Sequence, residues 1–317
     1  MSTCIRAGIV GAGSIGRNHA RIYSELAGVD FTAVLDTNPE AARAISEQYG
    51  VKVTATLEEF IDLVDVATVA TPTPGHYEVG KFLLTRGKHL LIEKPITETP
   101  EQAQELVKLA QKSSLVLQVG HIERFNPVLG ALEKRLTRPR FIEAHRLSPY
   151  PFRNVEIGVI LDLMIHDLEI ILHLVRSPVK SIDAVGVPVL SKGEDIANAR
   201  IRFENGCVAN ITASRISPEK TRKIRVFQKD AYLSLDYQNQ TGEMDQLING
   251  KIIRKAVEIN KDEPLKSELQ SFVECSRTGI QPVVSGSEAA AALALAIEIT
   301  ELAKSATGES VQGILAG

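Results

Sequence analysis

The sequence Gly11-Ala12-Gly13-Ser14-Ile15-Gly16 has a spacing that suits the phosphates of a dinucleotide. In a G-x-G-x-x-G turn the first glycine permits a tight turn, the second lets the backbone approach a pyrophosphate, and the third lets a helix pack closely on a strand. A tight turn in an α/β protein that binds no dinucleotide is the alternative. The predicted cofactor contacts in this turn are Gly11, Gly13, Ser14, Ile15 and Gly16.

Asp36 stands 20 residues after Gly16, at the end of an apolar run. A carboxylate there can accept hydrogen bonds from both ribose hydroxyls of adenosine, and it would repel a 2′-phosphate. Thr37 and Asn38 follow, so no arginine stands directly after Asp36 to hold that phosphate. The sequence therefore predicts NAD in preference to NADP, in contact with Asp36 and Thr37.

A lysine that could act on a substrate ends another apolar run, in Leu91-Ile92-Glu93-Lys94-Pro95. The carboxyl ends of strands line the ligand crevice of an open α/β sheet, and Pro95 restricts the turn after the lysine. An earlier run ends in Thr71-Pro72-Thr73-Pro74-Gly75-His76, a rigid loop that we place against the nicotinamide ribose. A stiff connector without ligand contact is the alternative for this loop. The predicted cofactor contacts from both segments are Thr71, Pro72, Pro74, His76, Glu93 and Lys94.

Asp162 and His166 lie four residues apart in the apolar stretch Gly158–Glu169, and hence on one face of a helix. A carboxylate one turn before an imidazole can hold its tautomer and raise its basicity, as a general base requires. From spacing alone, a core histidine satisfied by a helical neighbour is the better interpretation. His173 follows seven residues after His166, but no convincing third ligand accompanies them, so we predict no metal site.

Polar residues that could hold a substrate follow the next apolar run, in Gly120–Pro127. Arg124 and Asn126 alternate with an aromatic residue there, so a guanidinium and an amide could face the same way. Arg146 and Arg215 would also suit a phosphorylated substrate, although each arginine could equally be a surface or interface residue. The predicted substrate contacts are Lys94, Arg124, Asn126, Arg153 and His166.

The elements that must position these residues alternate between strand and helix over the first 120 residues. Such alternation, with continuous apolar strands, is typical of βαβ units in a parallel sheet covered on both faces. Right-handed crossovers then give a doubly wound Rossmann sheet. The expected strands are Ile5–Val10, Phe31–Leu35, Val64–Ala70, His89–Ile92 and Leu115–Val119, and the expected helices are Ile15–Leu26, Ala41–Tyr49, Leu57–Ile61, Tyr77–Thr85 and Glu101–Gln111.

After Gly120 the pattern predicts an α+β domain with a large, mainly antiparallel open sheet and helices on one face. Glu204-Asn205-Gly206, between two alternating runs, predicts a hairpin. We place an NAD-binding domain at residues 1–121 and a substrate-binding and oligomerisation domain at residues 122–317. The expected strands are Phe141–Leu147, Ile182–Val187, Ala197–Phe203, Cys207–Arg215, Lys223–Phe227 and Tyr232–Asp236, and the expected helices are Pro127–Leu136, Val159–Leu174, Leu265–Arg277 and Ser287–Ala306.

The composition disfavours several other classes of protein. The chain has 317 residues, of which 44% are apolar, as expected for two globular domains. A net charge of −3 disfavours nucleic-acid binding, and the absence of Trp disfavours stacking of sugars on indole rings. The longest apolar run, Ala289–Ile297, is too short to span a bilayer. With three distant cysteines and no signal-peptide pattern at its start, the sequence predicts a cytoplasmic protein without disulfides or zinc.

The glycine turn, Thr71–His76, Glu93-Lys94-Pro95 and Asp162–Asp167 together resemble the Gfo/Idh/MocA oxidoreductases, over essentially the whole chain. The resemblance implies a two-domain NAD(P)-dependent enzyme that acts on CH–OH groups of sugars, cyclitols or related alcohols. In that family the lysine of the Glu-Lys-Pro tripeptide is catalytic, the prolyl bond is often cis, and the open sheet commonly builds an oligomer interface. Lys94 matches that lysine.

The resemblance also reverses the interpretation of His166. The family typically has an aspartate, a histidine four residues later, and a second acid three further on; Asp162 and His166 match, and Glu169 stands where aspartate is usual. The resemblance therefore implies that His166 removes the hydroxyl proton, that Asp162 orients His166, and that Lys94 stabilises the developing alkoxide.

Two runs, His121–Pro127 and Gly158–Glu169, resemble the branch of the family that oxidises UDP-N-acetylglucosamine at C3. The leading hypothesis is an NAD-dependent dehydrogenase that oxidises a secondary alcohol group of a sugar. In this hypothesis the sugar is part of a nucleotide sugar. We expect a homo-oligomer, dimer or tetramer, formed through the C-terminal sheet, with no nucleic-acid or membrane partner. An inositol, aldose or sugar-acid dehydrogenase is the second hypothesis. A non-catalytic NAD-binding regulator is the third, and the intact lysine, aspartate and histidine argue against it.

Overall fold

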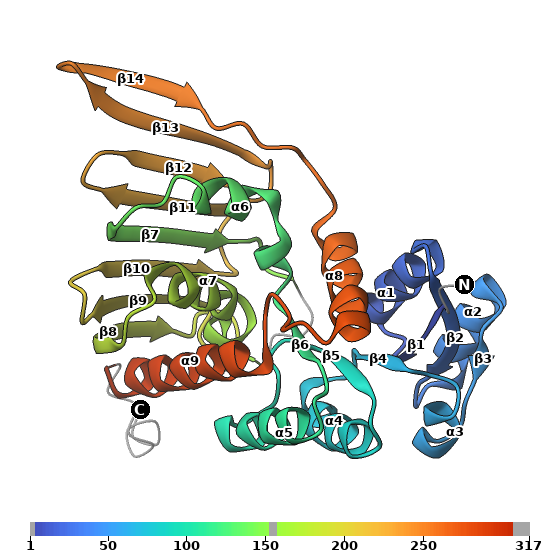
Figure 1. Ribbon diagram of the computed structural model, residues 1–317. Coiled ribbons are helices and arrows are strands. Elements are labelled where there is room, and N and C mark those ends of the chain that lie inside the picture. Colours follow the sequence, from blue (N-terminus) through green and yellow to red (C-terminus); the bar gives the residue numbers. More distant parts are fainter. Residues whose placement is uncertain (1–3, 152–156, 307–317) are drawn as a thin grey trace, which may run out of the picture. The chain divides into compact units, whose positions relative to one another are not determined.

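The computed structural model describes residues 4–151 and 157–306 (Figure 1). Their contacts divide them into two compact units: one holds the described residues within 1–125 and 263–291, and the other those within 126–262 and 292–317. The predicted boundary at residue 121 assigns residues 263–291 to the second domain, whereas in the structure they pack with the first unit.

The first unit contains a six-stranded sheet in the order β3-β2-β1-β4-β5-β6, in which every pairing is parallel. This is the strand order of a Rossmann sheet, and it confirms the predicted doubly wound fold. The order reverses between β1 and β4, where the carboxyl ends of the strands face a ligand crevice in folds of this kind. The strands are β1 (Ile5–Val10), β2 (Val29–Leu35), β3 (Lys52–Val53), β4 (Val66–Val69), β5 (His89–Glu93) and β6 (Leu117–Gly120).

Side chains cap the N-termini of several helices of the first unit. The Asn38 side chain accepts the amide hydrogens of Glu40 and Ala41 at the start of α2, and Thr99 and Gln102 form a reciprocal capping box at the start of α5. The helices are α1 (Ser14–Glu25), α2 (Pro39–Tyr49), α3 (Leu57–Ile61), α4 (His76–Thr85), α5 (Pro100–Lys112) and α8 (Pro264–Thr278), with short 3-10 turns η1 (Thr73–Gly75) and η2 (Ile122–Phe125).

Helix α8 joins the core of the first unit although it follows the whole second sheet in the chain. Leu269 and Phe272 are fully buried in one apolar cluster with Ile22 and Tyr23 of α1. The amphipathic sequence of α8 predicts a helix with one buried face, but it does not say which core that face joins. This is the physical reason why the predicted boundary differs from the observed division.

The second unit contains an eight-stranded sheet in the order β14-β13-β12-β11-β7-β10-β9-β8. Only β7 and β10 pair in parallel and the other pairings are antiparallel, which confirms the predicted, mainly antiparallel sheet. The strands are β7 (Pro139–Leu147), β8 (Val179–Val187), β9 (Ile196–Phe203), β10 (Val208–Ser214), β11 (Thr221–Gln228), β12 (Tyr232–Asp236), β13 (Thr241–Ile248) and β14 (Lys251–Ala256).

Helices cover one face of this second sheet (Figure 1). Helix α6 (Pro127–Glu133) contacts β12, and helix α7 (Ile165–Val175) contacts β7. A π-helical segment, η3 (Ile160–Met164), leads directly into α7. Helix α9 (Gly286–Ala306) begins in the first unit and continues into the second. Burial alternates along β9 and β10, as expected for a sheet with one covered face.

The hairpin of β13 and β14 was not predicted from the sequence. Asn249 and Gly250 form its turn, with φ angles of 51° and 74°. Asn-Gly is the pair that two-residue hairpin turns favour, because both positions need a positive φ. The signal was present, but the polar strands around it lack a clear apolar alternation.

None of the helices in the described part of the chain combines the length and the apolar character that a membrane crossing needs.

Candidate functional site

The predicted cofactor residues gather along one edge of the first sheet. The glycine turn follows β1, Asp36 and Thr37 follow β2, the segment Thr71–His76 follows β4, and Glu93 ends β5. Strands β2, β1, β4 and β5 are consecutive neighbours in a parallel sheet, so their carboxyl ends lie side by side. The structure therefore brings together residues that the sequence spreads over about 80 positions.

The three glycines of the turn have different surroundings. Gly11 has a φ of +105°, and a β-carbon there would lie 2.5 Å from the backbone of Ala70. A β-carbon on Gly16 would lie 1.9 Å from the carbonyl oxygen of Gly11, so the start of α1 packs tightly on the turn. Gly13, by contrast, has nothing within 4 Å of that position. The open space at Gly13, directly before the amide groups of α1, fits a dinucleotide pyrophosphate.

The difference between Gly13 and Gly11 gives a matched test. We expect Gly13→Val to keep the thermal stability of the wild type and to lose NAD affinity, because the new side chain fills the open space. Gly11→Ala is expected to lower the free energy of unfolding by about 2 kcal/mol or more, because it combines an unfavourable φ with a backbone clash. Thermal unfolding and NAD titration check both variants; a Gly13→Val protein with unchanged NAD affinity would contradict the assignment of the turn.

Asp36 is oriented by backbone amides at the end of β2. Its Oδ2 accepts the amide hydrogen of Ala12 at 2.5 Å, and its Oδ1 accepts that of Asn38 at 2.7 Å. The first bond ties the carboxylate to the glycine turn, so the two predicted cofactor elements are neighbours. This arrangement fits an adenosine ribose bound across β1 and β2.

His76 connects the loop after β4 to the segment that carries Lys94. Its Nδ1 lies 2.9 Å from the carbonyl oxygen of Pro95, and its Nε2 lies 2.8 Å from that of Thr71. The Lys94–Pro95 peptide bond is cis. His76 was predicted to contact the cofactor. It is 1% exposed, and its two contacts hold the loop Thr71–Gly75 against the segment that follows β5.

His121, directly after β6, was not among the predicted site residues. It is 1% exposed, and Lys94 and Arg124 carry positive charges nearby. Burial, and then these two charges, lower the pKa of His121 to about 3. His121 is therefore a neutral imidazole beside the lysine at physiological pH. Its place at the carboxyl end of β6, next to β5, is the signal that could have identified it.

The lowered pKa of His121 predicts a pH dependence of stability. Between pH 6.5 and about 3 the unfolded chain binds a proton at this residue and the folded chain does not, so folding stability falls as the pH falls through that range. We expect His121→Asn to reduce this loss by up to about 1.4 kcal/mol per pH unit. Urea unfolding of the wild type and of His121→Asn at pH 7 and pH 5 measures the free energy of unfolding of each protein. If the two proteins differ in this free energy by the same amount at both pH values, the prediction is contradicted.

In the second unit, the predicted proton-transfer pair lies where η3 passes into α7. Asp162 belongs to the π-helical segment and His166 to the first turn of α7, and both are half-buried. Single π-helical turns inside helices are frequently found at functional sites. The expected helix over Val159–Leu174 is thus present, but its first part is π-helical.

Buried ion pairs anchor the elements around this pair. Arg146 of β7 donates to Asp167 of α7 through Nε at 2.7 Å and Nη2 at 3.1 Å. Arg215 donates to Asp195 at 2.7 Å and to the carbonyl oxygen of Ile157 at 2.6 Å. The idea that Arg146 and Arg215 suit a charged substrate is not supported, because both are buried and bonded to partners within the unit.

The remaining predicted substrate residues also have partners in their own units. Arg124 is 5% exposed in its side chain and donates to the carbonyl oxygen of Val283 at 3.1 Å. Asn126 caps α6 by accepting the amide hydrogen of Val128, and its Nδ2 donates to the carbonyl oxygen of Tyr237. These bonds give both residues structural roles, and their contacts with a substrate stay predictions. Arg153 lies outside the described residues.

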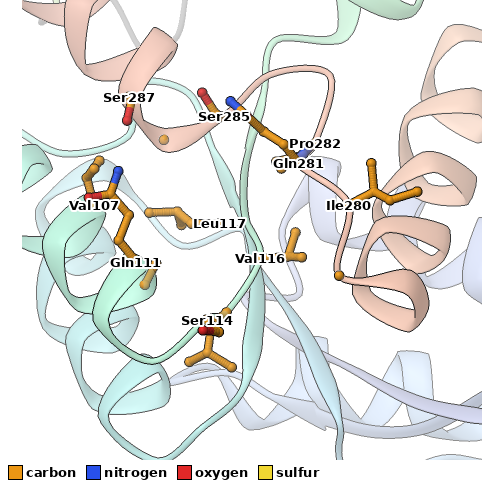
Figure 2. Close-up of a pocket in the computed structure, with 14 residues that line it drawn as sticks. Val107, Gln111, Ser114, Val116, Leu117, Ile280, Gln281, Pro282, Ser285 and Ser287 are labelled. Atoms are coloured by element: carbon orange, nitrogen blue, oxygen red, sulfur yellow. The ribbon is translucent and has the colours of Figure 1, made fainter.

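Two further features of the first unit were not predicted. A pocket of about 400 Å³ lies between α5 and the chain after α8, at the amino end of β6 and therefore away from the edge that carries Lys94. Figure 2 shows the residues that line it. His19, Glu93 and Glu268 form a cluster of possible metal-binding groups among the described residues. Sequence patterns gave no signal for this cluster, because α8 enters the unit from the far end of the chain.

Comparisons with known proteins cover both units. The pattern described as an oxidoreductase family with an NAD-binding Rossmann fold matches residues 5–121, and that of the Gfo/Idh/MocA C-terminal domain matches residues 132–234. UDP-N-acetylglucosamine 3-dehydrogenase of Acidithiobacillus ferrooxidans is 35% identical over 276 residues, which cover 85% of this chain and 88% of that one. Inositol 2-dehydrogenase of Rhizobium meliloti is 26% identical over 315 residues, or 92% and 94% of the two chains.

A solved structure of the Acidithiobacillus ferrooxidans UDP-N-acetylglucosamine 3-dehydrogenase is similar throughout. It matches this chain with a TM-score of 0.91 at 32% identity, covering 95% of this chain and 98% of the other.

Proposed function

Because this chain belongs to the Gfo/Idh/MocA family of oxidoreductases, we propose that it oxidises a secondary alcohol group on the sugar part of a nucleotide sugar. The substrate we propose resembles UDP-N-acetylglucosamine, with oxidation at C3 and NAD as the hydride acceptor. The observation that carries the proposal is the 35% identity to UDP-N-acetylglucosamine 3-dehydrogenase over 85% of this chain. The chain is an oxidoreductase with a nicotinamide-binding fold; the substrate and the choice of NAD are the proposed parts.

The proposed reaction assigns a task to each of three residues. A nicotinamide cofactor held by the glycine turn and Asp36 would supply the hydride acceptor for the carbon that carries the alcohol. His166 removes the hydroxyl proton as general base, and Asp162 orients His166. The Lys94 ammonium stabilises the negative charge that develops on the oxygen. The anchoring of α7 by Asp167 and Arg146 supports a fixed position for His166.

Asp36 supports NAD as the cofactor, since a carboxylate at the end of β2 would repel the 2′-phosphate of a cofactor bound at the glycine turn. We expect Asp36→Ala to lower kcat/KM for NAD about tenfold to a hundredfold, because a charged partner of the ribose hydroxyls is lost. We also expect the preference for NAD over NADP to shrink. Steady-state kinetics of the wild type and the variant measure kcat/KM for NAD and for NADP. A wild type that prefers NADP would contradict the choice of NAD.

A panel of substrates tests the proposed function. Purified protein is incubated with NAD and, separately, with UDP-N-acetylglucosamine, free N-acetylglucosamine, myo-inositol or glucose, and reduced nicotinamide is followed by absorbance. We expect the highest kcat/KM with UDP-N-acetylglucosamine. If free N-acetylglucosamine supports NAD reduction with the same kcat/KM as UDP-N-acetylglucosamine, the nucleotide does not contribute to substrate recognition and the proposal is contradicted.

A second candidate is an inositol dehydrogenase. The similarity to inositol 2-dehydrogenase of Rhizobium meliloti extends over 92% of this chain, although the identity is lower. Both candidates need the same lysine, histidine and cofactor, so the residues of the site do not separate them. A preference for myo-inositol in the panel would select the second candidate.

We further propose that the second unit forms the contact of a homo-oligomer. Its uncovered sheet face carries exposed apolar side chains, among them Val185 at 45%, Val187 at 41% and Phe227 at 37% exposure. Burying such side chains against another copy would be favourable. A monomer at micromolar concentration in light scattering would count against this association.

A further inference from the structure

Three titratable side chains meet inside the first unit, although they come from distant parts of the chain. His19 lies on α1, Glu93 ends β5, and Glu268 lies on α8, with one ligand-capable atom of each within 4.8 Å of the others. His19 and Glu268 are fully buried, and the Glu93 side chain is 15% exposed. None of the roles assigned above uses His19 or Glu268.

Glu93 has a partner in this cluster. Nε2 of His19 lies 3.1 Å from Oε1 of Glu93, while Nδ1 of His19 lies 3.4 Å from the hydroxyl of Thr68. Gly120 lies against the same carboxylate, since a β-carbon there would come within 2.8 Å of it. His19 and β6 therefore confine the side chain that immediately precedes Lys94.

Glu268 is in a different position. Both of its carboxylate oxygens are buried, and neither has a hydrogen-bond partner among the described residues. An ionised group there would place a second negative charge beside Glu93 without any donor to stabilise it, which is costly. Burial, and then the Glu93 carboxylate, raise the pKa of Glu268 well above its usual value.

The other groups near Glu268 are two uncharged side chains, Gln118 and Tyr23, and His19, which faces Glu93. Gln118 of β6 donates its amide hydrogen to the backbone carbonyl of Glu268 at 3.1 Å, which fixes α8 at this point. The Tyr23 hydroxyl lies 2.7 Å from Thr68, and burial raises its pKa, so it stays neutral. His19 already faces Glu93. A proton or a bound cation must therefore neutralise Glu268.

We propose that Glu268 carries a proton in the folded protein and that this neutral acid, with His19, holds Glu93 and thereby positions Lys94. Protonation of Glu268 leaves no second charge beside Glu93, and His19 Nε2 stays 3.1 Å from Oε1 of Glu93. An ionised Glu268 would repel Glu93 and compete for His19. Because Glu93 and Lys94 are adjacent, a displacement of Glu93 reaches the lysine through the backbone. The positioning role rests on the function proposed above for Lys94; the protonation does not.

Infrared spectroscopy of the whole protein at neutral pH tests the protonation. We expect the C=O stretch of a buried carboxylic acid in the wild type and its absence in Glu268→Gln. Glu274→Gln is the matched control, because it removes a carboxyl group of the same helix that is 64% exposed, and it should keep the band. A wild type without the band overturns the proposal. So does a stoichiometric metal ion in the purified protein that is lost in Glu268→Gln, since a cation would then replace the proton.

Turnover of UDP-N-acetylglucosamine with NAD tests the positioning role. Glu268→Gln keeps a neutral side chain of the same shape, so we expect kcat near that of the wild type. Glu268→Leu is also uncharged, but it removes the O–H group that the neutral acid can direct at Glu93, whose carboxylate lies within 4.8 Å, and we expect kcat to fall about tenfold to a hundredfold at unchanged NAD affinity. Equal kcat values in the two variants overturn the positioning role. If the wild type did not turn over this substrate, the proposed function would fail, while the infrared band would still decide the protonation of Glu268.

Discussion

Replacement of Lys94 by alanine is expected to lower kcat about 100-fold to 1000-fold while NAD affinity stays close to that of the wild type. The loss follows from the task proposed for the ammonium group, because removing one donor to a developing oxyanion typically costs this much. NAD affinity should persist because the glycine turn and Asp36, which lie after other strands, are unchanged. Single-turnover kinetics and NAD titration separate the two effects.

Lys112→Ala is the control for this experiment. Lys112 is exposed at the end of α5, so its removal should alter neither kcat nor NAD affinity. An unchanged kcat in Lys94→Ala would remove the lysine from the mechanism. An equal loss of NAD affinity and of kcat would instead mean that the lysine serves the cofactor.

Replacement of His166 by asparagine is expected to lower kcat about 100-fold to 10,000-fold, the range typical of a lost general base. A base must be deprotonated to act, so the wild-type rate should fall toward acidic pH. Asparagine does not titrate, and the acidic fall should therefore be absent from the residual activity. The pH–rate profiles of the wild type and of His166→Asn show whether the fall in rate toward acidic pH is lost in the variant.

His173→Asn is the control on the same helix. His173 lies two turns after His166, and its Nε2 is 2.5 Å from Oε1 of Glu133, which gives it a structural partner. Its replacement should leave the pH–rate profile unchanged. A profile of the same shape in His166→Asn and in the wild type would assign the base to another residue.

Local sequence patterns predicted the strands and turns that carry the proposed cofactor residues of the first unit. The glycine turn, Asp36 and the Glu-Lys-Pro tripeptide each combine a strand end with a local chemical requirement, and the parallel strand order brings them to one edge. The second unit's hairpin at Asn249–Gly250 carries an equally local turn signal, but its strands lack the apolar alternation that would identify them as strands.

Contacts between distant segments could not be predicted from such patterns. The periodicity of α8 specifies an apolar face, but tertiary packing alone decides that it buries Glu268 beside Glu93. Similarly, the sequence shows that Arg146 is a cation, and only the fold shows that Asp167 neutralises it. A charged residue that sequence pattern assigns to a substrate can instead be neutralised by a buried partner that only the tertiary fold brings near, as Asp167 is for Arg146.

Deuterium transfer tests the proposed hydride transfer from C3 of the sugar to NAD. Wild-type protein is incubated with NAD and UDP-N-acetylglucosamine that carries deuterium at C3, and the products are examined by mass spectrometry and NMR. We expect the deuterium to appear at C4 of the nicotinamide, together with a 3-keto sugar. A substrate labelled at C4 of the sugar should keep its deuterium. Retention of the C3 label in the sugar while NAD is reduced, or transfer from C4 instead, would contradict the account.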